Sequence, residues 1–208
     1  MADPATPSDV ELLQLMVAGS EDAFVTLYRR HENRVYRFAL QMSGSATIAE
    51  DVTQEVFMVL MREAVRYDAA RGALSTYLYG VARNYVLRYL GRDRCQIQIG
   101  DDAEDDTSGG AEEGLIVRDD PLSELARREM IEQVRAAVLA LPARYREVVV
   151  LCDLHEMSYA EASAVLDCAV GTIRSRLHRG RALLVVKLRA TQQQDQASPK
   201  VNSARCLA

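Results

Sequence analysis

The most informative stretch of the chain is SYAEASAVLDCAVGTIRSRLHRGR, residues 158–181. Ser158 and Glu161 have the spacing of a capping box, which predicts the start of a short helix. The three residues 167–169 (DCA) predict a break, and an arginine-rich helix is predicted to follow it. Two short helices joined by a tight turn are typical of a helix-turn-helix, whose second helix enters the major groove of DNA.

The second helix of this pair has an apolar face and a basic face. Ile173, Leu177 and Leu184 recur at helical spacing and are predicted to anchor it to a core. Between Val170 and Arg189 there are six Lys or Arg residues and no acid. A basic face is often only a solvated surface, but six positive charges without a compensating acid favour DNA binding. The side chains predicted to face outward are Arg174, Ser175, His178 and Arg179.

The residues that precede this pair also predict helices. Asp120 followed by Pro121 is typical of an N-cap and a first helical position. One apolar stripe ends before Pro142, and a further helix with its own apolar stripe is predicted after it. The residues predicted to point inward are Ile131, Val134, Val138, Leu141, Tyr145, Val148, Val149 and Cys152.

The N-terminal part is predicted to be helical as well. Ser20 is expected to cap a helix through Leu27, and a second, longer apolar pattern continues to Leu40 before Gly44 breaks it. Residues 67–72 (YDAARG) are predicted to form a loop, followed by a long helix over residues 75–94 with Leu78, Val81, Ala82, Tyr85 and Tyr89 inward. No segment alternates for long with a period of two residues, so the predicted fold class is all-α.

Between Gly44 and the loop lies a helix with two different stripes. Thr47 and Glu50 have capping-box spacing, which predicts its start. One stripe is apolar and is predicted to be core: Val52, Val56, Val59 and Leu60. The other recurs at the same spacing on another face, as either a solvated face or a docking surface: Asp51, Gln54, Glu55, Met58 and Arg62.

Charge divides the chain into parts. The 208 residues hold 25 Lys or Arg against 30 Asp or Glu, which gives a formal charge of −5. Residues 96–122 hold nine of the acids and a single basic residue, Arg118, which predicts a flexible acidic linker. The predicted organisation is a helical domain over 10–95, this linker, a second helical domain over 123–190 and a disordered tail over 191–208.

Composition excludes several classes of protein. No apolar run approaches the roughly 18 residues that a membrane span needs, and no charged-then-apolar leader opens the chain, so we expect a soluble cytoplasmic protein with no membrane contact. Cys95, Cys152, Cys168 and Cys206 lie far apart, so no disulfide framework is expected. Cys152 and His155 have metal-ligand spacing, but a buried thiol is the better interpretation. No catalytic constellation is present, so we expect no enzyme, no metal and no cofactor.

Several blocks of sequence carry a resemblance to a known family. In the first part they are AEDVTQEVF (residues 49–57) and YLYGVARN (residues 77–84). In the second part they are Leu141-Pro142, VVL (149–151), Ser158-Tyr159 and above all VGTIRSRLHR (170–179). In this order and spacing they resemble the extracytoplasmic-function (ECF) sigma factors of bacterial RNA polymerase. The resemblance implies a promoter-specific initiation factor, with sigma region 2 over 10–95 and sigma region 4 over 123–190.

The resemblance also implies partners. The mixed polar stripe of Asp51, Gln54, Glu55, Met58 and Arg62 would dock on the clamp helices of the polymerase β′ subunit, where hydrogen bonds and apolar area both contribute. The second domain would also bind the β flap, and the acidic linker would pass through the polymerase cleft toward the RNA exit path. Many members of the family are held inactive by an anti-sigma factor, which is a further implied partner.

The loop and the long helix after it would read the unwound non-template strand of the minus-10 promoter element. Single-stranded bases stack on aromatic rings while Arg follows the phosphates, and Asn84 matches an Asn of the family. Tyr77 stands where the family usually has Trp, and Arg88 where an acid is common. The implied contacts are Tyr67, Arg71, Tyr77, Arg83, Asn84 and Arg88.

The arginine-rich helix would read the minus-35 element in the major groove. Arginine can bond both acceptors of a guanine, and a helix N-terminus suits a phosphate. Asp167 replaces the usual Gly of the turn, and Ala169 replaces a frequent Pro. The implied contacts are Gly171, Thr172, Arg174, Ser175, His178 and Arg179, with Arg176 in support of the backbone contacts. Because the isoelectric point is near 5.3, the free protein is expected to bind DNA weakly and in a salt-sensitive way.

Two other classes of protein remain open on sequence alone. A helix-turn-helix repressor or activator with an N-terminal sensing or dimerisation domain explains the second part, but not the stripes and the Tyr–Arg helix of the first. An interaction protein with an incidental basic helix would have no effect at a promoter. Copurification with polymerase, as opposed to dimerisation on a palindrome, distinguishes the sigma factor from the repressor.

Overall fold

The described part of the chain consists of helices in two groups. The computed structural model describes residues 7–69, 72–97 and 121–197, and these contain no strand, which confirms the all-α prediction. The first group is α1 (Asp9–Val17), α2 (Glu21–Ser43), α3 (Ala46–Glu63), the short η1 (Ala64–Arg66) and α4 (Leu74–Ile97). The second is α5 (Pro121–Leu139), α6 (Ala143–Val149), the π-helical turn η3 (Val150–Leu154), α7 (Tyr159–Leu166) and α8 (Val170–Ala197).

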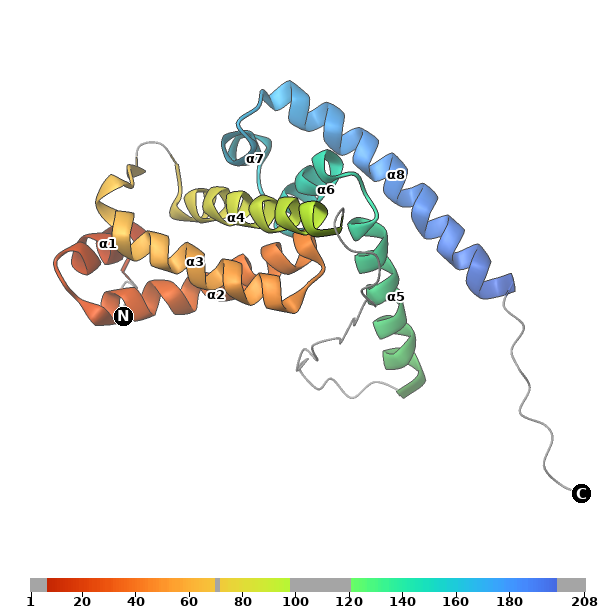
Figure 1. Cartoon of the computed structure of the whole chain (residues 1–208), viewed down its shortest axis with the longest axis horizontal. Coiled ribbons are helices and arrows are strands. Elements are labelled where there is room, and N and C mark those ends of the chain that lie inside the picture. The colour runs from red at the N-terminus through yellow and green to blue at the C-terminus, as the bar shows by residue number, and fades with distance from the viewer. Residues whose placement is uncertain (1–6, 70–71, 98–120, 198–208) are drawn as a thin grey trace, which may run out of the picture.

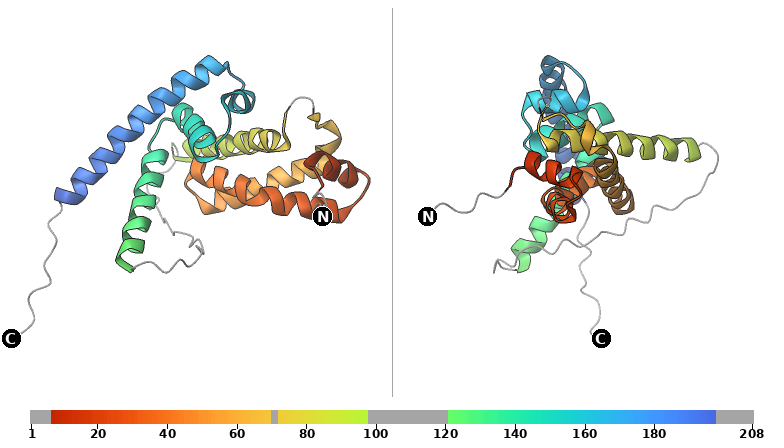
Figure 2. Two further views of the ribbon diagram at one scale, coloured as in Figure 1. Left: turned by 180° about the vertical axis from the view of Figure 1, so that it is seen from behind. Right: turned by 90° about the vertical axis from the view of Figure 1, so that its left-hand side faces the viewer.

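The first group is a bundle of α2, α3 and α4, with α1 across one end (Figure 1). Its core is made of large apolar side chains with almost no exposed surface: Leu27, Phe38, Met42, Leu60, Leu74 and Leu78. Asp9 connects α1 to α2. Its carboxylate accepts a hydrogen bond from Nη1 of Arg30 at 2.5 Å and lies 2.8 Å from Nε2 of His31. The C-terminal end of α4 projects away from the bundle (Figure 2).

The second group is built around the contact of α6 with α8. Ile173 and Leu177 are fully buried, as the apolar stripe predicts, and they lie beside Val149 and Leu166 in one core cluster. Gly180 lets the two helices approach closely, because a Cβ atom there would lie 2.9 Å from Cγ2 of Val149. The N-terminal part of the long helix α8 is therefore packed closely on α6 by buried side chains.

The two groups pack against each other. The contacts join α4 to α7, and α2 to α5 and η3, so that α2 and α4 of the first bundle face the second group (Figure 1). The sequence prediction of two tethered domains did not include this packing. Most of the predicted acidic linker and the end of the predicted tail lie outside the described residues, as does Asp120.

Several predicted boundaries are wrong. The pattern through Leu27 and the one through Leu40 belong to a single helix, α2, because no Gly or Pro interrupts it before Gly44. Ser45, and not Thr47, caps α3: its hydroxyl accepts from the amide of Ile48 at 3.4 Å. Helix α4 begins one residue earlier than predicted, at Leu74, and ends at Ile97.

Other local predictions are confirmed. The Ser158 hydroxyl accepts from the amide of Glu161, and the Glu161 carboxylate accepts from the Ser158 amide at 2.8 Å, so the capping box is complete. Asp167 ends α7 at φ +49, in the left-handed region that Asp tolerates better than most residues. Pro121 is the first residue of α5.

Candidate nucleic-acid interface

The helix-turn-helix of α7 and α8 is fixed by hydrogen bonds within its turn. The Ser163 hydroxyl donates to the carbonyl of Cys168 at 2.5 Å, and the Thr172 amide donates to the carbonyl of Ala169 at 2.8 Å. Cys168 is half-buried and packs against the core. The N-terminus of α8 therefore leaves the turn in a defined direction.

The predicted minus-35 residues occupy the first three turns of α8. Five of them are exposed: Gly171, Arg174, Ser175, His178 and Arg179. Thr172 and Arg176 are half-buried, which agrees with a supporting place for Arg176. The guanidinium of Arg174 lies 5.8 Å from the centre of the Tyr159 ring, at the start of α7. An exposed row of arginines at a helix N-terminus can bind phosphates and base edges together.

Arg181 is an arginine of this helix that the sequence does not distinguish from the others. Its Nε and Nη2 donate to the two oxygens of Asp153, at 3.1 and 2.5 Å. This hydrogen bond raises the pKa of Arg181 above its ordinary value. The fork-shaped pair joins α8 to η3, so Arg181, although exposed, is held within the second group and positions α8.

The mixed stripe on α3 borders a hollow of about 740 Å³ between α2 and α3. Gln54 and Met58 line this hollow, whereas the other three predicted residues, Asp51, Glu55 and Arg62, do not. Its remaining walls combine aromatic or apolar side chains with polar ones. The aromatic or apolar side chains are Phe24, Tyr28, Tyr36, Phe57 and Met61, and the polar ones are Glu32, Asn33, Glu50 and Thr53.

Rings from α2 and α3 form the floor of the hollow. The centres of Tyr28 and Phe57 are 4.7 Å apart, and Phe24 meets Phe57 edge-to-face. Burial, followed by the nearby carboxylate of Glu32, raises the pKa of Tyr28. Sequence reasoning missed Phe24 and Tyr28 because they belong to the preceding helix, and only the packing of α2 on α3 brings them to this face.

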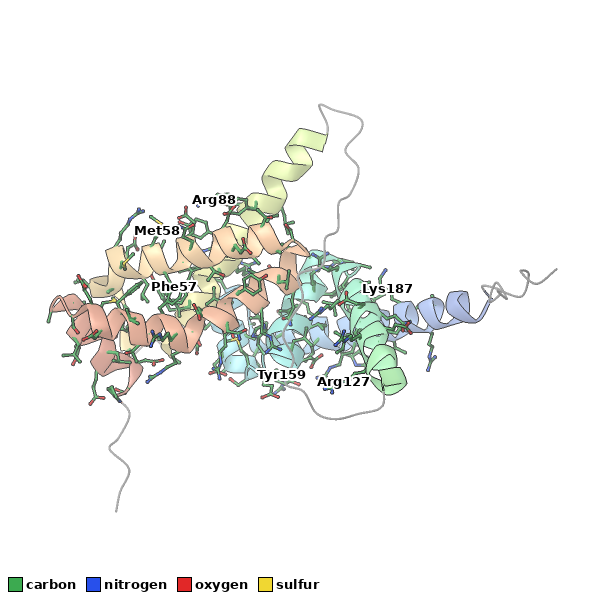
Figure 3. All side chains as sticks on the ribbon, turned by 90° about the horizontal axis from the view of Figure 1, so that it is seen from below. Phe57, Met58, Arg88, Arg127, Tyr159 and Lys187 are labelled. Carbon is green, nitrogen blue, oxygen red and sulfur yellow. The ribbon has the colours of Figure 1, made fainter. Side chains whose placement is uncertain are left out.

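The predicted minus-10 residues are divided by the structure. Tyr67 and Tyr77 meet edge-to-face with ring centres 5.9 Å apart, and the Tyr67 hydroxyl donates to the carbonyl of Gly72 at 2.7 Å. Asn84 and Arg88 are exposed one turn apart on α4. In Figure 3, Arg88 lies on the same side of the molecule as Met58 of α3, and Tyr159 of α7 lies on the opposite side.

Arg83 does not share that face. Its Nε donates to Glu147 of α6 at 2.7 Å, and Glu147 is buried in the contact between the two groups. Arg71 lies outside the described residues. The described residues thus bring Tyr67 together with Tyr77, and Asn84 with Arg88, but they place Arg83 against the second group.

A second hollow, of about 550 Å³, adjoins the loop before α4. Tyr67, Gly72 and Ser75 line it together with the Asp9, Arg30 and His31 cluster. Burial, which outweighs the nearby Asp9 carboxylate, lowers the pKa of His31. The lining is of mixed charge, because the Asp9 carboxylate already pairs with Arg30 and His31.

No group of three His, Cys, Asp or Glu side chains in the part of the chain that the structure describes is placed to hold a metal ion. Cys152 is half-buried and its pKa is raised, chiefly by burial, as a packed thiol requires. Among the described helices, none has the length and apolar character to cross a bilayer.

Two family models match the chain in the order of the two helical groups. Residues 27–95 match the family described as Sigma-70 region 2, and residues 131–184 match Sigma-70, region 4. The ECF RNA polymerase sigma factor SigW of Bacillus subtilis is 32% identical over 174 residues, which cover 82% of this chain and 91% of SigW. The ECF RNA polymerase sigma-E factor of Escherichia coli K12 is 31% identical over 180 residues, covering 84% of this chain and 91% of that protein.

A third relative is longer. The ECF RNA polymerase sigma factor SigE of Mycolicibacterium smegmatis is 36% identical over 160 residues, which cover 76% of this chain but only 58% of SigE. Two solved structures share the fold. The structure of CnrH in complex with the cytosolic domain of CnrY matches with a TM-score of 0.62 at 23% identity, over 92% of this chain and all of that one. The sigma factor RpoE in complex with the anti-sigma factor NepR from Bartonella quintana matches with a TM-score of 0.64 at 23% identity, over 80% of this chain and 96% of that one.

Proposed function

Because this chain belongs to the ECF RNA polymerase sigma factors, we propose that it binds core RNA polymerase, directs it to specific promoters and helps to open the minus-10 element. The observation that carries the proposal is the match of both sigma regions in their order along one chain. A repressor with an unrelated sensing domain is not favoured, because the first helical group is itself sigma region 2.

We propose that three surfaces of the chain bind the polymerase, the minus-10 element and the minus-35 element. Gln54 and Met58, with the aromatic floor of the 740 Å³ hollow, would receive the clamp helices of β′, and Asp51, Glu55 and Arg62 would surround that contact. Asn84 and Arg88 with the Tyr67–Tyr77 pair would hold the minus-10 strand. The exposed row on α8 would read the minus-35 element, with Gly171 and Thr172 on a phosphate.

The proposed partners follow from the family and from its solved complexes. Core polymerase, through its clamp helices and β flap, and promoter DNA are the functional partners. Anti-sigma factors accompany sigma factors in the RpoE–NepR structure, which supports such a partner for this chain. Sigma factors are non-catalytic regulators of transcription, so we propose that this chain is a cytoplasmic regulator and not an enzyme. We propose that it consists of sigma region 2 (10–95), an acidic linker (96–122), sigma region 4 (123–190) and a tail (191–208).

The test is reconstituted run-off transcription with bacterial core polymerase on a library of genomic fragments. Discrete start sites are expected with the intact chain and not with core alone. The double variant Arg174→Ala/Arg179→Ala should lose most of them, whereas Arg189→Ala, an exposed arginine farther along α8, should not. Specific duplex binding by the protein alone, without any core-dependent start site, would overturn the proposal.

A further inference from the structure

Tyr159 of α7 lies beside the arginine row of α8. The guanidinium carbon of Arg174 lies over its ring, 5.8 Å from the ring centre, which is within the range of a cation–π contact. Tyr159 is the first residue of α7, and the capping box of Ser158 fixes the start of that helix. Tyr159 is 38% exposed, and Figure 3 shows it at the surface of the second helical group. The contact therefore joins the two helices of the helix-turn-helix on a face that is open to solvent.

Arg174 differs from the other arginines of α8 in what surrounds its guanidinium. Arg181 is bound through two nitrogens by the Asp153 carboxylate. Arg179 is exposed, and no described ring lies under its guanidinium. Within the described residues, the guanidinium of Arg174 makes the ring contact and no hydrogen bond or ion pair. A ring contact uses none of the five N–H donors of a guanidinium, so all five remain available to DNA while the ring restricts where they point.

The pair of Arg181 with Asp153 leaves the Tyr159 ring to Arg174. Arg174 and Arg181 are seven residues apart, which is about two turns, so they lie on the same side of α8. The pKa of Arg181 is raised chiefly by its hydrogen bond to Asp153 and to a smaller extent by Tyr159, so Tyr159 lies near both arginines. Because Asp153 already binds the Arg181 guanidinium on the side of η3, Arg174 is the arginine that stays over the ring.

We propose that Tyr159 is a positioning residue that determines specificity at the minus-35 element: its ring holds the Arg174 guanidinium in the orientation in which two N–H groups meet N7 and O6 of one guanine. The proposal rests on the proposed function of α8. A side chain that is already oriented loses less conformational freedom on binding than an unrestrained one. A bidentate contact with a base edge demands one orientation of the guanidinium, whereas attraction to the phosphates tolerates many. The ring therefore affects which base is selected more than how tightly DNA is bound.

The hydroxyl of Tyr159 supplies the competing interpretation, a direct hydrogen bond to a phosphate. A phenol can donate to a phosphate oxygen, and such a bond contains no information about base sequence. The two interpretations depend on different parts of the side chain. Positioning needs the ring, which Phe retains and Leu lacks, whereas a phosphate bond needs the hydroxyl, which both Phe and Leu lack.

The first experiment measures base preference in the complete complex. Holoenzyme assembled from bacterial core polymerase and the full chain binds a promoter found by run-off transcription, with its minus-35 element randomised, and the bound fragments are sequenced. Arg174→Ala identifies the base pair that Arg174 reads, and Arg179→Ala identifies a reference base pair. Tyr159→Leu is expected to reduce discrimination at the Arg174 base pair by about three- to tenfold and to leave the reference base pair unchanged. Tyr159→Phe should retain the discrimination at both.

Several results would overturn the proposal. Unchanged discrimination in Tyr159→Leu would show that the ring does not orient Arg174. A uniform loss of affinity in both Tyr159→Phe and Tyr159→Leu would indicate a phosphate bond, and an equal loss of preference at every base pair would indicate a purely structural role. A further loss of discrimination caused by Tyr159→Leu in an Arg174→Ala background would show that the ring acts through another residue.

The contact is also tested without DNA, by nuclear magnetic resonance of the free full chain. The ring should shift the Nε–H proton of Arg174 upfield, Arg174→Lys assigns this signal by removing it, and Tyr159→Leu should abolish the shift. Arg144, whose guanidinium lies 4.7 Å from the centre of the Tyr145 ring, is the matched reference and should keep its own shift. If Tyr159→Leu does not fold, as judged by circular dichroism, the shift in the unmodified chain remains the test.

The two measurements separate the positioning of Arg174 from the sigma function. A missing ring shift on Arg174 overturns the positioning proposal even if core-dependent start sites appear. Missing start sites overturn the proposed function, and with it the reading of a minus-35 element by Arg174, even if the ring shift is present.

Discussion

Gly180 is a position of close approach between α8 and α6. Its missing Cβ would lie 2.9 Å from Cγ2 of Val149 and 3.4 Å from the carbonyl oxygen of Tyr145. Val149 is buried and β-branched, so it has few rotamers with which to withdraw. The position thus favours glycine for a reason of packing, although glycine is a weak helix former.

We therefore expect Gly180→Ala to destabilise the protein by about 1–2 kcal/mol, since the overpacking outweighs the gain in helix propensity. Urea unfolding followed by circular dichroism measures this. Gly91→Ala is the matched variant, because its Cβ would meet open space on α4, and it should stabilise by up to about 1 kcal/mol. Equal stabilisation by both substitutions would show that α8 does not pack as described.

His155 gives the fold a dependence on pH. Burial, with Arg37 and Arg34 nearby, lowers the pKa of His155 from 6.5 to about 4. The folded chain therefore binds fewer protons than the unfolded chain between these values, so stability is full above pH 6.5 and is lost as the pH falls toward 4. The loss attributable to this group reaches about 3 kcal/mol at most.

The expected result is a melting temperature that falls from pH 6.5 to pH 4.5, with a shallower fall in His155→Gln. His31 contributes to the fall in melting temperature in the same direction, because its pKa is also lowered. His31→Gln should therefore remove part of the fall that remains in His155→Gln. His178→Gln, an exposed histidine of α8, is the comparison. A full pH dependence in His155→Gln would mean that His155 is not buried against α2 and α4.

At the scale of the element, the capping box of α7 orients the whole helix-turn-helix. Ser158→Ala removes the hydrogen bond that the hydroxyl accepts from the Glu161 amide and the one that it donates to the Glu161 carboxylate, and it should cost about 1 kcal/mol in unfolding free energy. The same substitution at Ser8, which caps α1 with Glu11 in the same way, should cost about as much. Only Ser158→Ala should also weaken transcription from promoters that depend on the minus-35 element, and an equal effect of Ser8→Ala would contradict this.

The elements themselves were predicted well wherever a local signal exists. Ser158 with Glu161, the left-handed Asp167 and the stripe of Ile173 and Leu177 are all decided within one or two turns of chain. The errors occur where two signals compete. Ser45 and Thr47 both can cap α3, and Ser45 does so because Gly44 has already ended α2 in the left-handed conformation.

At the scale of the molecule, the sequence predicts the parts and not their contact. Arg83 shows the reason: its sequence neighbours place it on the helix that follows the loop, but its partner Glu147 lies 64 residues away. The same holds for Phe24 and Tyr28 in the hollow beside Met58. No periodicity within one helix contains information about which other helix will face it.

Net charge determines how this molecule should meet DNA. With a formal charge of −5, the free chain gains little from counterion release as a whole. Duplex promoter DNA, identified from the run-off experiment, should therefore bind at least about 100-fold more tightly when core polymerase is present to hold both DNA-binding surfaces together. Fluorescence anisotropy at a fixed salt concentration measures this, and equal affinity with and without core would contradict it.

The pairing of Arg83 with Glu147 has a consequence for how mutational scans are read. Truncation of Arg83 leaves the buried carboxylate of Glu147 without this partner, so it lowers the stability of the protein whether or not Arg83 contacts DNA. A loss of promoter output in a scan of single alanine substitutions would therefore not by itself identify Arg83 as a DNA contact. Its importance becomes visible only in pairs, when Arg83 and Glu147 are varied together and the departure from additivity is measured.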